Sequence, residues 1–143
     1  ELAKKTVTVT KGWSEAYGMF LDGEADMVLS YTSSPAYHLI AENKPQYQAA
    51  AFEEGHYRQV EVAAKLKSAA QDKLADQFLQ FMVSPAFQQE IPAGNWMYPV
   101  IDQPLPKGFE QMITVAKPLA FSTDEVAANR KNWIREWLQA VTQ

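Results

Sequence analysis

The feature that most constrains the fold is a helical stretch between two strand-like stretches in the first thirty residues. Residues 6–10 alternate threonine with valine, which is typical of a half-buried strand. Ser14 is a suitable N-cap for a helix that continues to Leu21, and residues 26–30 then form a short run typical of a buried strand. Parallel sheets are built from this order of elements. We therefore expect an α/β fold.

The rest of the chain continues the mixture of strands and helices. Residues 47–52 and 57–66 are interpreted as strands, and four prolines and two glycines make residues 92–108 mostly irregular. In all we expect roughly four strands and five helices. The further helices are expected from Ser33 to about Glu42, from Gln71 to the break at Ser84, from Pro85 through Phe87 and Ile91, and from Ser122 to Val141.

The last helix has the clearest start signal. Ser122 and Glu125 have the spacing of a capping box, in which each side chain bonds a free backbone N–H at the helix start. Trp133 and Trp137 then recur at helical spacing on one face. We expect both tryptophans to be core residues.

Composition excludes several function classes. The absence of cysteine removes disulfides, thiolate zinc sites and cysteine nucleophiles, and the two histidines are not spaced as a zinc pair. A net charge of −4 does not suit nucleic acid, and no apolar run is long enough to cross a bilayer. Sequence patterns for a phosphate loop, a dinucleotide fold or a nucleophile elbow are also missing. We expect no metal, no cofactor, no nucleic-acid partner and no membrane-embedded segment.

Several aromatic residues lie next to strand ends and loops rather than on amphipathic faces. Trp13 and Tyr31 each follow a predicted strand, Tyr37 lies in the next helix, and Trp96 lies in the loop GNWMYP. Ligands of open α/β sheets bind at the carboxyl ends of the strands, where Trp13 and Tyr31 would lie. Flat aromatic faces bind planar or cationic rings at about 0.5 to 2 kcal/mol per contact. A single tryptophan is more often a packing residue, so the shared loop context carries this interpretation.

A run of hydroxyl groups follows Tyr31. Thr32, Ser33 and Ser34 lie at the start of the helix expected from Ser33, where the first backbone N–H groups are expected to be free. Hydroxyls and amides at a helix start bind polar or anionic groups such as phosphate. These residues add polar contacts to the predicted aromatic site.

The motifs that join these features resemble those of the periplasmic thiamine-binding proteins of enteric bacteria. The segments that carry the resemblance are KGWSEAYGMFLDGEADMVLSYTSSPAYH (11–38), GHYRQVEVAAK (55–65), QFLQFMVSPAFQQEIPAGNWMYPV (77–100) and WIREW (133–137). GEADMVLSY is common to many two-lobed binding proteins, whereas GW, SYTSSPAYH and GNWMYPV in combination are much more specific. The resemblance covers essentially this whole chain and the C-terminal part of the family protein.

The resemblance implies part of a type II periplasmic-binding-protein fold, with two lobes of mixed or parallel sheets flanked by helices. Residues 1–54 and 113–143 are expected in the second lobe and residues 55–112 in the first, with Trp13 and Trp96 facing each other across the cleft. The implied ligands are thiamine and its mono- and diphosphate, the implied location is the periplasm, and the implied partner is the membrane permease of an ABC importer. The ligand-binding residues carried over are Trp13, Tyr31, Thr32, Ser33, Ser34, Tyr37 and Trp96.

Two other classes stay open. A related receptor for a sugar would also use aromatic platforms, and one for ferric iron would use Tyr31 and Tyr37 with a histidine. An enzyme of the same fold that cleaves thiamine would need a strong nucleophile, usually cysteine, which this chain lacks. We therefore expect a binding protein, and we expect the chain on its own to bind weakly and to self-associate.

Overall fold

The computed structural model describes residues 2–142, and the chain divides into two compact units. The first unit contains the residues up to Ser30 together with those from Leu119 onward. The second unit contains Tyr31–Pro118.

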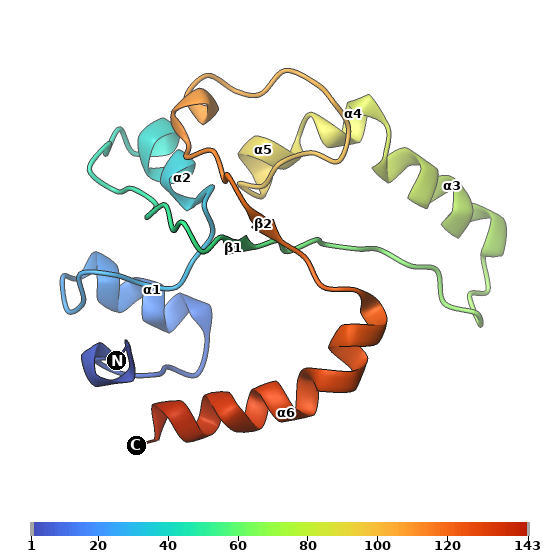
Figure 1. Ribbon diagram of the computed structural model, residues 1–143. Helices are drawn as coiled ribbons and strands as arrows, with labels where there is room; N and C mark the ends of the chain where they lie inside the picture. The colour runs from blue at the N-terminus through green and yellow to red at the C-terminus, as the bar shows by residue number, and fades with distance from the viewer. Residues whose placement is uncertain (1, 143) are drawn as a thin grey trace. The chain divides into compact units, whose positions relative to one another are not determined.

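The first unit is built from helices at both ends of the chain (Figure 1). The short 3₁₀ helix η1 covers Leu2–Lys5 and is followed by α1 at Trp13–Leu21. The N-cap of α1 is Gly12, whose backbone is extended, so the helix begins before Ser14, the predicted cap. Gly23 has a φ of 78° and turns the chain after α1, a left-handed conformation that favours glycine.

The third helix of this unit, α6 at Thr123–Val141, starts as predicted but is not buried as predicted. The Ser122 hydroxyl accepts a hydrogen bond from the Glu125 backbone N–H at 3.2 Å, which confirms the cap. Trp133 contacts Phe121, with ring centroids 5.3 Å apart, yet Trp137 is 51% exposed. The expectation that Trp133 and Trp137 are core residues is wrong here, because both side chains are exposed.

The second unit contains most of the helices. In Figure 1, α3, α4 and α5 follow one another along the green-to-yellow part of the chain, and α4 contacts both of its neighbours. None of the described helices is long and apolar enough to cross a bilayer. The elements are α2 (Ser34–Ala41), β1 (His56–Tyr57), α3 (Asp72–Met82), α4 (Pro85–Gln88), α5 (Ile91–Gly94), η2 (Phe109–Gln111) and β2 (Pro118–Leu119). The boundary between the units falls within β2, since Pro118 belongs to the second unit and Leu119 to the first.

The helix predicted from Pro85 through Ile91 is two short helices in the structure. Pro85 and Pro92 each lie in the first turn of a helix, where a missing backbone N–H costs nothing. Within one continuous helix, the ring of Pro92 would clash with the carbonyl four residues earlier, that of Gln88. Helix α4 therefore ends at Gln88, and a separate helix, α5, begins at Ile91.

The strands are where the sequence prediction is wrong. Residues 6–10, 26–30 and 47–52 form no strand, and of residues 57–66 only Tyr57 belongs to one. The described strands, β1 and β2, pair with each other, and β2 was not predicted. A strand requires a hydrogen-bonded neighbour, and the apolar residues of a predicted strand without one remain exposed, as Val7 is at 66% and Leu29 at 92%.

The small core of the second unit lies around α2. Ala36 and His38 of α2 and Pro92 of α5 are fully buried or nearly so, and Phe109 of η2 is also buried. Gly108 brings η2 close to α2, since a Cβ at this position would lie 2.8 Å from the Ile40 Cγ1 atom. This core fixes the helix that carries Tyr37.

Candidate ligand-binding site

Two of the predicted site residues form an aromatic corner in the second unit. The rings of Tyr37 and Trp96 lie edge to face, with centroids 5.3 Å apart and planes at 76°. Tyr37 is a partly exposed residue of α2, and half-buried Trp96 follows α5 in the chain. Edge-to-face pairs are favourable because the positive ring edge meets the negative ring face. The corner presents aromatic surface against which a planar cation can pack.

The loop that carries Trp96 is fixed by contacts on several sides. Trp96 itself has a left-handed φ of 54°, which is uncommon for a large side chain. The Asn95 side-chain amide donates to the Glu61 carboxylate at 3.3 Å, and Tyr98 packs on Phe109 with centroids 5.7 Å apart. Burial raises the pKa of Tyr98 above its ordinary value of 10.0. The Trp96 ring is therefore held in place without a ligand.

The hydroxyl-rich segment forms the turn into α2. The Tyr31 backbone N–H donates to the Ser34 hydroxyl oxygen at 3.2 Å, and the Ser34 N–H donates to the Tyr31 carbonyl at 3.0 Å. The Ala36 N–H donates to the Ser33 carbonyl at 3.0 Å. The expectation of unpartnered amides at this helix start is wrong for Ser34 and Ala36. Ser33 is only 5% exposed, so Tyr31, Thr32 and Ser34 present the accessible polar surface.

A buried histidine fixes the far end of α2. His38 is 0% exposed, its Nδ1 atom lies 2.7 Å from the Glu42 carboxylate, and its ring stacks near Tyr47 at 4.1 Å. The hydrogen bond with His38, and then the contact with Lys44, hold the pKa of Glu42 below its usual value. Among residues 2–142 no cluster of three potential ligands could hold a metal ion. His38 therefore positions the helix, and the adjacent Tyr37 faces outward.

Trp13 lies in the first unit, where local contacts fix its ring. As the first residue of α1 it donates its indole N–H to the Ser30 hydroxyl at 3.1 Å. One face of its ring stacks on Tyr17, with centroids 4.7 Å apart, and the side chain as a whole stays exposed. Tyr17 and Ser30 were not identified from the sequence, although Tyr17 has the helical i, i+4 spacing from Trp13. The predicted opposition of Trp13 and Trp96 stays a prediction.

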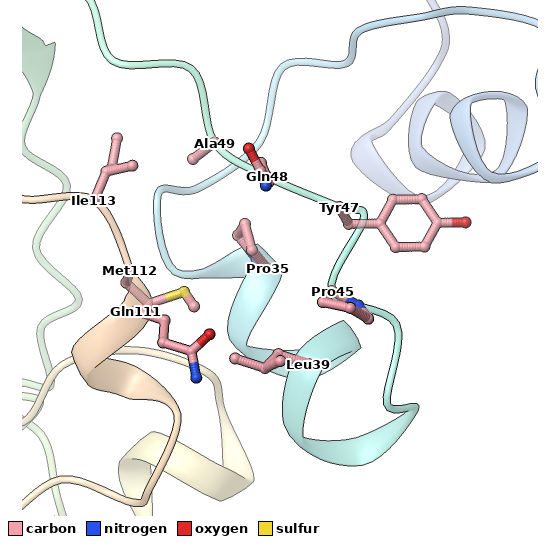
Figure 2. A pocket seen from close by; sticks show the side chains of 9 residues that line it. All are labelled: Pro35, Leu39, Pro45, Tyr47, Gln48, Ala49, Gln111, Met112 and Ile113. Atoms are coloured by element: carbon pink, nitrogen blue, oxygen red, sulfur yellow. The ribbon is translucent and has the colours of Figure 1, made fainter.

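A hollow of about 220 Å³ lies beside α2 but outside the predicted site (Figure 2). Its walls are Pro35 and Leu39 of α2, residues 45 and 47–49, and Gln111–Ile113. None of the predicted ligand residues lines it. The predicted site residues of this unit thus lie outside this hollow.

Comparison with known proteins gives matches along the whole chain. The profile of the family described as bacterial extracellular solute-binding protein matches residues 1–89. The thiamine-binding periplasmic protein of Escherichia coli (strain K12) is 63% identical over 143 residues, which are 100% of this chain and 44% of that protein. That of Brucella abortus biovar 1 (strain 9-941) is 48% identical over 145 residues, covering 100% of this chain and 43% of that protein.

A solved structure matches equally well. It is described as a periplasmic thiamin binding protein, superposes with a TM-score of 0.94 at 63% identity, and is matched over 99% of this chain and 45% of its own. The chain thus spans less than half the length of these relatives. The predicted fold class, part of a two-lobed α/β binding protein, is confirmed. The assignment of residues to the two lobes stays a prediction.

Proposed function

The chain belongs to the family of bacterial extracellular solute-binding proteins, and we propose that it forms part of a periplasmic receptor for thiamine. The receptor carries thiamine, or its mono- or diphosphate, to the membrane permease of an ABC importer. It acts without a cofactor and releases its ligand chemically unchanged. The names of the relatives, which include thiamine and the periplasm, support this proposal.

The observation that carries the proposal is the aromatic corner of Tyr37 and Trp96 beside the turn at Tyr31–Ser34. Thiamine has a flat pyrimidine ring and a permanently charged thiazolium ring. An aromatic face attracts a desolvated cation by about 2 kcal/mol, and the hydroxyls of the turn suit the polar groups of the ligand. The net charge of −4 also favours a cation over an anion.

The phosphates of the phosphorylated forms gain little from this part of the chain. The helix start at Ser34 has its first amides already bonded, and Ser33 is buried. We therefore assign recognition of the rings to the aromatic corner, and recognition of phosphate to other parts of the full-length protein.

Direct titration of the full-length protein tests the proposal. Calorimetry with thiamine should give saturable binding of one equivalent, and maltose should give no heat above dilution. Addition of ferric iron should produce no visible tyrosinate charge-transfer band. Binding of maltose or of iron in place of thiamine would assign the aromatic wall to a different solute and overturn the proposal.

A matched pair of tryptophan variants tests the site itself. Trp96→Ala removes one wall of the aromatic corner, and thiamine affinity should fall about tenfold or more. Trp137→Ala removes a tryptophan of α6 that is outside the predicted site, and affinity should stay within about twofold. Equal losses in the two variants would show that the effect is general and not local to the corner.

Chemical analysis tests the absence of catalysis. After prolonged incubation of thiamine with the full-length protein, chromatography and mass spectrometry should recover the vitamin intact. Separate pyrimidine and thiazole products would contradict the proposal, because they require a nucleophile that attacks the vitamin.

A further inference from the structure

Hydrogen bonds to neighbouring helices fix both ends of the loop that carries Trp96. The Asn95 backbone N–H donates to the Ile91 carbonyl at 2.9 Å and ends α5. The Val100 backbone N–H donates to the Gln88 side-chain carbonyl at 2.8 Å. The four residues between Asn95 and Val100 therefore have both of their ends fixed.

Gln88 makes two hydrogen bonds that run in opposite directions. Its amide NH₂ donates to the Met82 carbonyl, the last residue of α3, at 2.7 Å, while its carbonyl accepts from Val100. The side chain is 6% exposed, so water cannot readily replace either bond. The amide satisfies both the Met82 carbonyl and the Val100 N–H only in this one orientation. Gln88 thereby joins the end of α3 to the end of the Trp96 loop.

This connection has a consequence for Trp96. Its left-handed backbone costs about 1 kcal/mol or more for a residue other than glycine, and it persists only where surrounding contacts hold it. Release of Val100 would let the loop relax and turn the Trp96 ring away from Tyr37. Resting on the thiamine-binding function proposed above, we infer that Gln88 is the positioning residue for the Trp96 wall of the ligand site.

Replacement of Gln88 by glutamate gives a test that acid can reverse. An ionised carboxylate still accepts from Val100, but it opposes the Met82 carbonyl with a second acceptor and buries a charge. A protonated carboxyl restores both bonds, since its O–H donates to Met82 and its carbonyl accepts from Val100. The ionised carboxylate is buried and cannot donate a hydrogen bond to Met82. Both effects raise the pKa of the introduced carboxyl, which places its titration nearer to neutral pH.

The experiment is thiamine binding by full-length Gln88→Glu between pH 5 and pH 8, expressed at each pH relative to the unaltered protein. We expect affinity about tenfold or more weaker at pH 8 and recovery to within about threefold at pH 5. The control is Gln89→Glu, the same change at the adjacent exposed residue, which should bind as the unaltered protein at every pH. Gln88→Leu removes both bonds and should stay weak at every pH.

The outcomes separate this inference from the function on which it rests. Absence of thiamine binding by the unaltered protein overturns the proposed function, whereas a pH-independent deficit or no deficit in Gln88→Glu overturns the role of Gln88 alone. Should Gln88→Glu not fold, hydrogen exchange in the unaltered protein decides. Slow exchange of the Val100 amide without ligand is expected, and exchange as fast as that of an open loop would overturn the inference.

Discussion

At the scale of single residues, Tyr37 shows how one side chain supports both packing and recognition. Its ring and the ring of Trp96 meet edge to face at 76°, and it also contacts the buried ring of His38. Both contacts use the aromatic ring and not the phenol oxygen. Removal of the ring should therefore affect ligand binding far more than removal of the hydroxyl.

Two substitutions at Tyr37 separate these contributions. Tyr37→Ala should weaken thiamine binding by about 1 to 2 kcal/mol, or roughly five- to thirtyfold, because it removes one face of the corner and leaves Trp96 unsupported. Tyr37→Phe should keep affinity within about threefold. Calorimetry on the full-length protein measures both, and a larger loss for phenylalanine than for alanine would show that the hydroxyl carries the interaction.

Two of the candidate residues that the sequence identified share one signal, the position of an aromatic residue in a loop or at a helix start. Trp13 and Trp96 were found in this way, and the structure fixes both rings by local contacts. Ser30 and Gln88 were missed. Each is important because its side-chain oxygen accepts a hydrogen bond of 3.1 Å or less from a residue distant in the sequence. Periodicity and composition carry no information about such contacts.

At the scale of elements, the helices were predictable and the strands were not. The start of α6 at Ser122 and the proline in the first turn of α2 depend on residues within one helical turn. The valine and threonine alternation in residues 6–10 describes a strand only when a neighbour pairs with it. Because that neighbour is not among the described residues, a correct local pattern gave a wrong element.

The close approach of η2 to α2 depends on a glycine, which leads to a prediction about stability. Gly108 has a φ of 111°, and a Cβ there would lie 2.8 Å from Cγ1 and 3.1 Å from Cδ1 of Ile40. Gly108→Ala should lower the free energy of unfolding by about 1 to 3 kcal/mol. Gly94→Ala is the matched control, since a Cβ there meets nothing within 4 Å, and it should be neutral or stabilising by up to about 1 kcal/mol. Urea unfolding of the full-length variants measures both, and equal effects would contradict this account of Gly108.

The other end of α2 predicts a dependence of stability on acid. The pKa of Glu42 is lowered in the folded chain by its hydrogen bond with His38 and its contact with Lys44, while Tyr47 and Tyr37 flank the same imidazole. A lowered folded pKa means that the stabilisation is complete above the ordinary value of 4.5 and is lost as pH falls through the folded pKa. The free energy of unfolding should therefore decrease in this acid range.

Neutralisation of this carboxylate tests the source of the acid effect. Glu42→Gln should be less stable than the unaltered protein at pH 7, and the difference should shrink as the pH falls below about 4.5. Glu53→Gln, in an exposed turn, is the control and should follow the unaltered protein throughout. Parallel curves for Glu42→Gln and the unaltered protein over the whole range would show that another group causes the acid loss.

At the scale of the whole molecule, the chain exposes apolar surface on several helices. Leu74, Phe78 and Phe81 follow one face of α3 and are all exposed, as are Ile134 and Leu138 of α6. Soluble monomers rarely expose apolar faces of this kind without a partner. The relatives are more than twice as long as this chain, so the intact proteins have further residues that can cover such faces.

The 143-residue chain expressed by itself should therefore self-associate and bind thiamine more weakly than the full-length protein. Sedimentation equilibrium should show an apparent mass above 16.1 kDa that rises with concentration. We expect the α3 face to drive this association, so Phe78→Lys with Phe81→Lys should reduce it, whereas Val62→Lys, at an exposed position outside α3, should reduce it less. A chain that stays monomeric at all concentrations and binds as tightly as the full-length protein would show that these apolar faces need no cover and that one aromatic wall is sufficient for recognition.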